Sequence, residues 1–151
     1  MRQMWIVVLA LLGAAVGCSH TMDVPKHFVS VDRSDLGPFV ERAISADGVV
    51  IALRRQDNPS NGTLEFWSEA LRNEMVNTQG YQFVKSEDVK SSTSQDGKLM
   101  EFAVEQRGTP LTYMMAVYVM RGDVVIVESG GKADEVKKHM TELRKSMLSA
   151  R

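Results

Sequence analysis

Residues 113–120 read Tyr-Met-Met-Ala-Val-Tyr-Val-Met, and residues 124–128 read Val-Val-Ile-Val-Glu after a short turn. Both alternating faces of the first stretch are apolar, so we expect a strand that is covered on both sides. Residues 99–106 differ, because Glu101 and Glu105 interrupt one of their two faces. That pattern predicts a strand closer to the edge of the same sheet.

Helical patterns lie on both sides of these strands in the sequence. The first follows Thr63, a good N-cap residue, and has apolar residues at spacings of three and four: Leu64, Trp67, Leu71 and Met75. The second follows Gly130-Gly131 and has a similar stripe: Val136, Met140, Leu143 and Met147. Earlier in the chain, Asp47-Gly48 predicts a two-residue type I′ hairpin. This order predicts an α+β fold, a largely antiparallel sheet with helices on both faces.

The start of the chain is typical of a secretory signal. Arg2 precedes an apolar run over residues 5–16, which is shorter than the roughly 20 residues that span a bilayer. The run ends at Gly17 and at Cys18, the only cysteine. Residues 15–18 resemble the bacterial lipobox, which implies cleavage between Gly17 and Cys18 and a diacylglycerol on the cysteine sulfur. An ordinary secretory signal cut at nearby small residues is the alternative.

This interpretation divides the chain into three parts: a signal peptide over 1–17, a polar lipidated tether over 18–27 and one globular domain over 28–151. Ser19 follows the cysteine, which resembles the enteric pattern of export to the outer membrane. We therefore expect a periplasm-facing protein, anchored by lipid and palmitate to the outer rather than the inner membrane.

Composition disfavours several classes of function. The formal net charge of −1 and the lack of a basic run argue against nucleic-acid binding. The three histidines have no partner at ligand spacing, so we expect no metal and no cofactor. Glu101 and Glu105 are two pleats apart, which favours a solvated strand face over a pair of catalytic carboxylates. Arg121-Gly122-Asp123 is interpreted as a turn rather than an adhesion motif.

The predicted order of elements resembles the PsbP-like superfamily over about residues 28–148. The features that carry the resemblance are the hairpin, the first helix, Gly80-Tyr81 before a run of strands, Asp96-Gly97 before a long strand, and the final helix. The superfamily includes the photosystem PsbP subunit, the Ran-binding Mog protein and many small bacterial lipoproteins. The resemblance implies an α/β/α sandwich that acts by binding protein complexes, with no shared active-site motif.

Two functional hypotheses follow. The first is a non-catalytic envelope lipoprotein that is tethered through Cys18 and docks on another envelope protein. The alternative is an envelope lipoprotein that binds a small ligand or an ion. A docking module should expose an apolar or aromatic surface, whereas a ligand-binding protein should have a concave pocket with converging polar groups. The sequence assigns no catalytic or ligand-binding residue.

Overall fold

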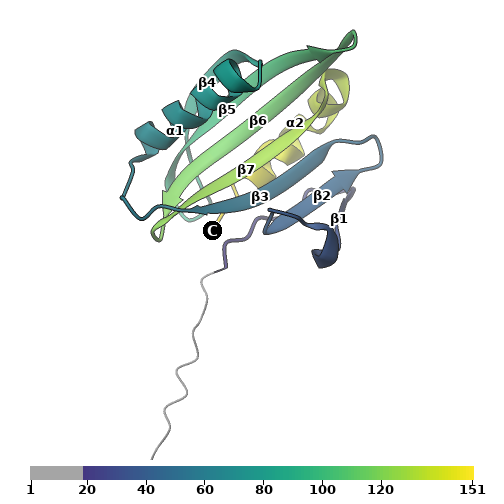
Figure 1. The fold of residues 1–151 in the computed structure, drawn as a ribbon. Coiled ribbons are helices and arrows are strands. Elements are labelled where there is room, and N and C mark those ends of the chain that lie inside the picture. The colour runs from purple at the N-terminus through teal and green to yellow at the C-terminus, as the bar shows by residue number, and fades with distance from the viewer. Residues whose placement is uncertain (1–18) are drawn as a thin grey trace, which may run out of the picture.

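A single antiparallel sheet organises the computed structural model, which describes residues 19–151 (Figure 1). Its strands are β1 (Phe28–Ser30), β2 (Glu41–Ser45), β3 (Val50–Asp57), β4 (Gln82–Lys90), β5 (Asp96–Gln106), β6 (Thr109–Met120) and β7 (Asp123–Lys132). The seven strands lie in the order β1-β2-β3-β7-β6-β5-β4, and every pair is antiparallel. The two strands with apolar residues on both faces, β6 and β7, are central, and β5 is next to the edge strand β4, as predicted.

Helices cover both faces of the sheet. Helix α1 (Leu64–Asn73) continues into a π-helical turn, η2 (Glu74–Thr78), on one face, while α2 (Ala133–Met147) lies on the other (Figure 1). Thr63 caps α1, because its hydroxyl accepts the Phe66 amide at 3.2 Å. The predicted α+β sandwich, with helices on both faces, is confirmed.

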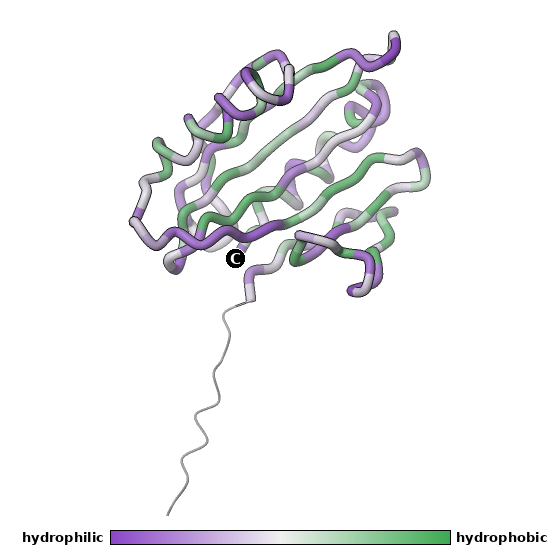
Figure 2. The backbone as a smooth tube through the Cα atoms, in the orientation of Figure 1, coloured by the Kyte–Doolittle hydropathy of each residue, from purple (hydrophilic) through white to green (hydrophobic). Residues whose placement is uncertain are grey.

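Each helix closes a separate core. The α1 side contains the predicted stripe of α1 together with side chains such as Phe102 and Ile126. The α2 side contains Leu143 and Met147, and also Tyr118, whose hydroxyl donates to the Met147 carbonyl at 3.0 Å. Burial raises the pKa of Tyr118 to about 12. Figure 2 shows the resulting pattern, with hydrophobic residues concentrated along the central strands.

Two tight turns join the central strands. Arg107-Gly108 and Arg121-Gly122 both have positive φ at both residues, 51° and 77° in the first and 54° and 80° in the second, as a type I′ turn requires. The turn interpretation of Arg121-Gly122-Asp123 is therefore confirmed. The predicted type I′ geometry at Asp47-Gly48 is wrong, since only Gly48 has a positive φ, although the hairpin between β2 and β3 does form.

The predicted tether over residues 18–27 differs from the structure. His20 and Met22 are buried, at 1% and 3% exposed, and Met22 belongs to the α2-side core. The backbones of Thr21 and Arg151 exchange two hydrogen bonds, at 3.0 and 3.1 Å. The Asp23 amide donates to Ser149 Oγ at 2.7 Å. The domain thus begins at about residue 20, because the contacts that fix this segment come from residues near the other end of the chain.

Candidate functional site

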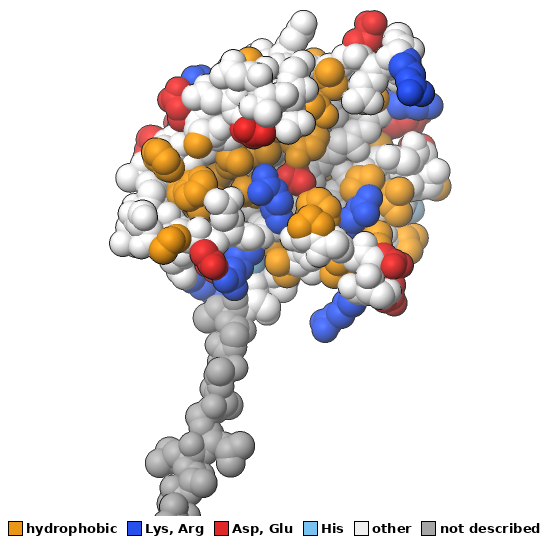
Figure 3. Space-filling view, viewed as in Figure 1, with side chains coloured by type: hydrophobic (Ala, Val, Ile, Leu, Met, Phe, Trp, Pro, Cys, Tyr) orange, Lys and Arg blue, Asp and Glu red, His pale blue; other side chains and the backbone are white. Residues whose placement is uncertain are grey.

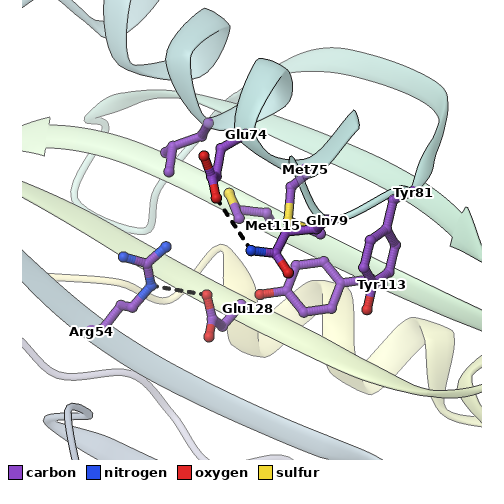
Figure 4. A pocket seen from close by; sticks show the side chains of 9 residues that line it. Arg54, Glu74, Met75, Gln79, Tyr81, Tyr113, Met115 and Glu128 are labelled. Atoms are coloured by element: carbon purple, nitrogen blue, oxygen red, sulfur yellow. Dashed lines mark hydrogen bonds and ion pairs between the residues drawn. The ribbon is translucent and has the colours of Figure 1, made fainter. Parts of the chain in front are cut away.

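The α1 face of the sheet is only partly covered, and a shallow groove runs along the open part beside α1 and η2. The section beside the helical segment has a volume of about 380 Å³. We call it the sheet groove, and it is lined by Arg54, Leu71, Glu74, Met75, Gln79, Tyr81, Tyr113, Met115 and Glu128. Figure 4 shows these side chains, which come from β3, β6, β7, the helical segment and the short connection before β4. The groove therefore combines an apolar floor with a polar and aromatic rim.

An ion pair crosses the groove. Arg54 Nε lies 3.0 Å from Glu128 Oε2, and both side chains are more than two-thirds buried (Figure 4). The pair forms because Ala52 lies opposite Glu128 in the register of β3 and β7, which makes Arg54 a diagonal neighbour of Glu128. On the helical side, Gln79 Nε2 donates to Glu74 Oε1 at 3.2 Å. The polar groups of the rim thus bind one another.

Two tyrosines form the aromatic end of the groove. The ring centroids of Tyr81 and Tyr113 are 5.6 Å apart, and the rings are tilted by 59°. Gly130 leaves space for Tyr113, since a Cβ there would lie 3.1 Å from Cδ2 of that ring. Burial raises the pKa of Tyr113 well above its usual range, and the negative charge of Glu128 raises it further. Tyr113 therefore stays neutral and can donate a hydrogen bond.

The groove extends toward β2. Beyond Tyr113 and Glu128 lies a second hollow of about 210 Å³, whose lining includes Phe39, Arg42 and Val50. Arg42 lies over the ring of Phe39, with its Cζ 6.0 Å from the centroid. Figure 3 shows this face, on which hydrophobic side chains surround a central group of basic and acidic ones. The whole surface is elongated, open and mixed in character.

Most polar side chains of the groove are already bonded to other side chains of the protein. Arg54 is paired with Glu128, and Glu74 accepts a hydrogen bond from Gln79. No group of three or more His, Cys, Asp or Glu residues within 19–151 is arranged to hold a metal ion. Within the same residues, the only buried side-chain polar atom without a hydrogen-bond partner is Nδ1 of His20, which is not part of the groove. The groove presents aromatic rings and a paired charge to solvent.

Two histidines have aspartate partners that the sequence did not reveal. His20 Nε2 lies 2.8 Å from Asp123 Oδ2, and His139 Nε2 lies 2.9 Å from Asp47 Oδ2. Asp47 also accepts a hydrogen bond from Ser45. In a catalytic triad, however, the histidine lies between the serine and the acid, whereas here the acid lies between the other two. The arrangement fixes the β2–β3 turn against α2.

The other candidate residues from the sequence remain apart from the groove. Glu101 faces Lys85 at 3.5 Å from Nζ, and Glu105 is exposed near the end of β5, so the two carboxylates form a strand face. Gly17 and Cys18 lie outside the described residues. No helix within residues 19–151 has the length and hydropathy needed to cross a membrane.

Comparison with solved structures identifies the architecture. The solution structure of cyanobacterial PsbP (CyanoP) from Synechocystis sp. PCC 6803 matches with a TM-score of 0.64. The match covers 91% of this chain and 95% of the other, at 15% sequence identity. The fold is PsbP-like. No protein-family model and no curated protein sequence matches the chain.

Other solved structures that match the chain are proteins from different bacteria. LpqN of Mycobacterium tuberculosis, described as involved in cell envelope biogenesis, matches with a TM-score of 0.63 at 16% identity, over 87% of this chain and 83% of that one. A Pseudomonas aeruginosa protein of unknown function, PA94, matches with a TM-score of 0.52 at 15% identity, over 89% and 84% of the two chains. At these identities, the likeness establishes the PsbP-like fold.

Proposed function

We propose that the protein is a non-catalytic lipoprotein of the bacterial cell envelope that docks on another envelope protein through the sheet groove. The lipobox-like residues before Cys18 support the lipid anchor and an envelope location. The fold, which resembles that of an M. tuberculosis protein involved in cell envelope biogenesis, supports an accessory role in the envelope. Ser19 after the cysteine supports the outer membrane as the destination.

The observation that carries the docking proposal is the state of the polar groups in the groove. Arg54 and Glu128 neutralise each other, and Gln79 donates a hydrogen bond to Glu74, so the central charges of the groove have partners without a ligand. Around them lie exposed parts of Tyr81 and the apolar floor. Protein interfaces favour such aromatic and arginine anchors within an open, mixed surface.

A small ligand is the second candidate, and the volume of the groove favours it. About 380 Å³ falls within the range of small-molecule pockets. Such pockets enclose most of the ligand and aim free polar groups at it, whereas this groove is shallow and its charged groups are paired. Native mass spectrometry of the purified domain tests for a bound molecule.

Replacing Cys18 with alanine tests the anchor. We expect the variant to lose palmitate labelling and to move from the membrane fraction to the soluble fraction, because two or three acyl chains are needed for firm anchoring. The measurement is fractionation of the protein's own cells with parallel palmitate labelling. Replacement of the exposed Ser94 with alanine is a control that should leave both readouts unchanged. Retention of the unlabelled variant in the membrane would contradict the proposed anchor.

Photo-crosslinking tests the docking surface. A photoreactive phenylalanine analogue is placed at Tyr81 in the groove or at Lys145, which is exposed on α2 on the opposite side of the sheet. We expect one envelope protein to crosslink at Tyr81 and not at Lys145. A second substitution, Arg54→Glu, should abolish that crosslink, since it places two acidic groups side by side. Equal crosslinking from both positions would reject the groove as the docking site.

A further inference from the structure

We infer that the domain rests directly on the headgroups of the membrane that holds its anchor, with the end of the sheet that carries the β6–β7 turn facing the lipid. The inference rests on the proposed lipid at Cys18. It concerns a second surface, distinct from the sheet groove, whose partner is a phospholipid headgroup layer.

The first step is the distance between the anchor and the domain. His20 is buried, with its side chain bonded to Asp123, so the fold begins two residues after Cys18. Two extended residues reach at most about 7 Å. The headgroup region on each side of a bilayer is about 5–7 Å thick. A cysteine whose lipid lies in the hydrocarbon therefore leaves no free space between the domain and the headgroups.

The second step is the strength of the attachment at residue 20. Three independent sets of contacts hold this segment: the His20–Asp123 hydrogen bond, the backbone pairing of Thr21 with Arg151, and the burial of Met22. If this segment detached to lengthen the connection between Cys18 and the domain, Met22 would become exposed and all of these hydrogen bonds would break. The short connection is therefore part of the folded domain rather than a slack linker.

The surface beside the anchor is the end of the sheet that carries the β6–β7 turn. Asp123, the partner of His20, immediately follows the Arg121-Gly122 turn, so this turn lies close to the anchored end. Ser19 and His20 also line a hollow of about 360 Å³ together with Arg33. Within residues 19–151, neither Arg33 nor Arg121 forms an ion pair with a carboxylate, which leaves both guanidinium groups available for lipid phosphates.

The fold supplies a matched pair of test positions. Strand β6 separates two Arg-Gly turns of nearly identical geometry, one near His20 and one at Arg107-Gly108. Twelve strand residues span about 40 Å, so Arg107 lies far from the membrane if Arg121 lies on it. Both arginines are exposed and have a similar positive φ, so a tryptophan probe meets the same backbone strain at either position.

The experiment uses residues 18–151, which contain every element of the domain. Cys18 is coupled to a maleimide phospholipid in vesicles of phosphatidylethanolamine and phosphatidylglycerol that also contain a nitroxide-headgroup lipid. Arg121→Trp or Arg107→Trp supplies the fluorophore in a Trp67→Phe background. We expect the nitroxide to quench the tryptophan at 121 several-fold more than the one at 107.

A Gly-Ser insertion between Cys18 and Ser19 is the matched control. Ten inserted residues reach about 17 Å on average, so the insertion should remove most of the difference between the two positions. Equal quenching without the insertion would overturn the inference. Because the anchor is attached chemically, a failure of lipidation in cells would appear in the palmitate labelling of the Cys18→Ala experiment and not in this one.

Discussion

Replacing Gly97 with valine is expected to destabilise the domain by about 3 kcal/mol or more, at the upper end of overpacking effects. A Cβ at this position would lie 2.4 Å from Cε1 of Tyr118 and 2.9 Å from the carbonyl oxygen of Val117. The ring has no room to move, because Tyr118 is fully buried and its hydroxyl is bonded to the Met147 carbonyl. The substitution therefore disturbs the sheet and the attachment of α2 together.

Urea unfolding measures this effect, and a double-mutant cycle identifies its cause. Tyr118→Leu removes most of the ring that the new side chain would strike. The double variant should be more stable than the sum of the two single effects predicts, by at least about 1 kcal/mol, as is common for residues in contact. Strict additivity would show that the valine acts through something other than Tyr118.

Replacing Met22 with aspartate is expected to cost about 3 kcal/mol, in the range found for losing a buried methionine. Met22 is 3% exposed within the apolar α2-side core, where a carboxylate would lose its hydration. The segment would detach rather than bury the charge, so the loss is limited to the free energy that holds it in place.

Lys26→Asp is the control, because Lys26 lies in the same segment but is exposed. We expect it to change the free energy of unfolding by no more than about 0.5 kcal/mol. Hydrogen exchange at the amides of Thr21 and Arg151 should speed up in the Met22 variant alone, since their mutual hydrogen bonds open with the segment. If both variants unfolded like the unmodified protein, residues 18–27 would be the flexible tether that their polarity suggests.

The sequence predicted the strands and helices whose apolar pattern lies within a single continuous stretch of residues. The apolar residues of β6 and α2 recur periodically. Each pattern therefore identifies the element and shows which of its faces are buried. The fold class followed from the order of these elements. The Arg107-Gly108 turn was not anticipated, because the apolar pattern that marks β6 begins only at Tyr113, whereas the strand itself begins at Thr109.

The contacts of residues 20–23 were not predictable from their own composition. Their polarity is typical of a linker, yet the partners that bury them, including Asp123 and Ser149, are more than 100 residues away in the chain. A short polar segment with one methionine gives no periodic signal. Only the fold brings the partners of this segment together.

The sheet groove was only partly predictable from the sequence. Tyr113 belongs to a strand that was expected to be covered on both sides, while the structure places it with Arg54 at the rim of one open surface. One signal was present: Arg54 and Glu128 each interrupt an apolar strand with a charge. Two opposite charges on buried strands favour a pair, but their register shows that they are neighbours.

The pairing of Thr21 with Arg151 also affects the timing of folding. Synthesis produces these two residues at opposite ends of the domain, and at ordinary rates of elongation roughly 6 to 26 seconds separate them. The α2 core cannot close around Met22 during that interval, since Met147 and Ala150 are made last. If Cys18 carries the proposed lipid, the segment beside it therefore stays unfolded, and open to the modifying enzymes, until the α2 core closes around Met22.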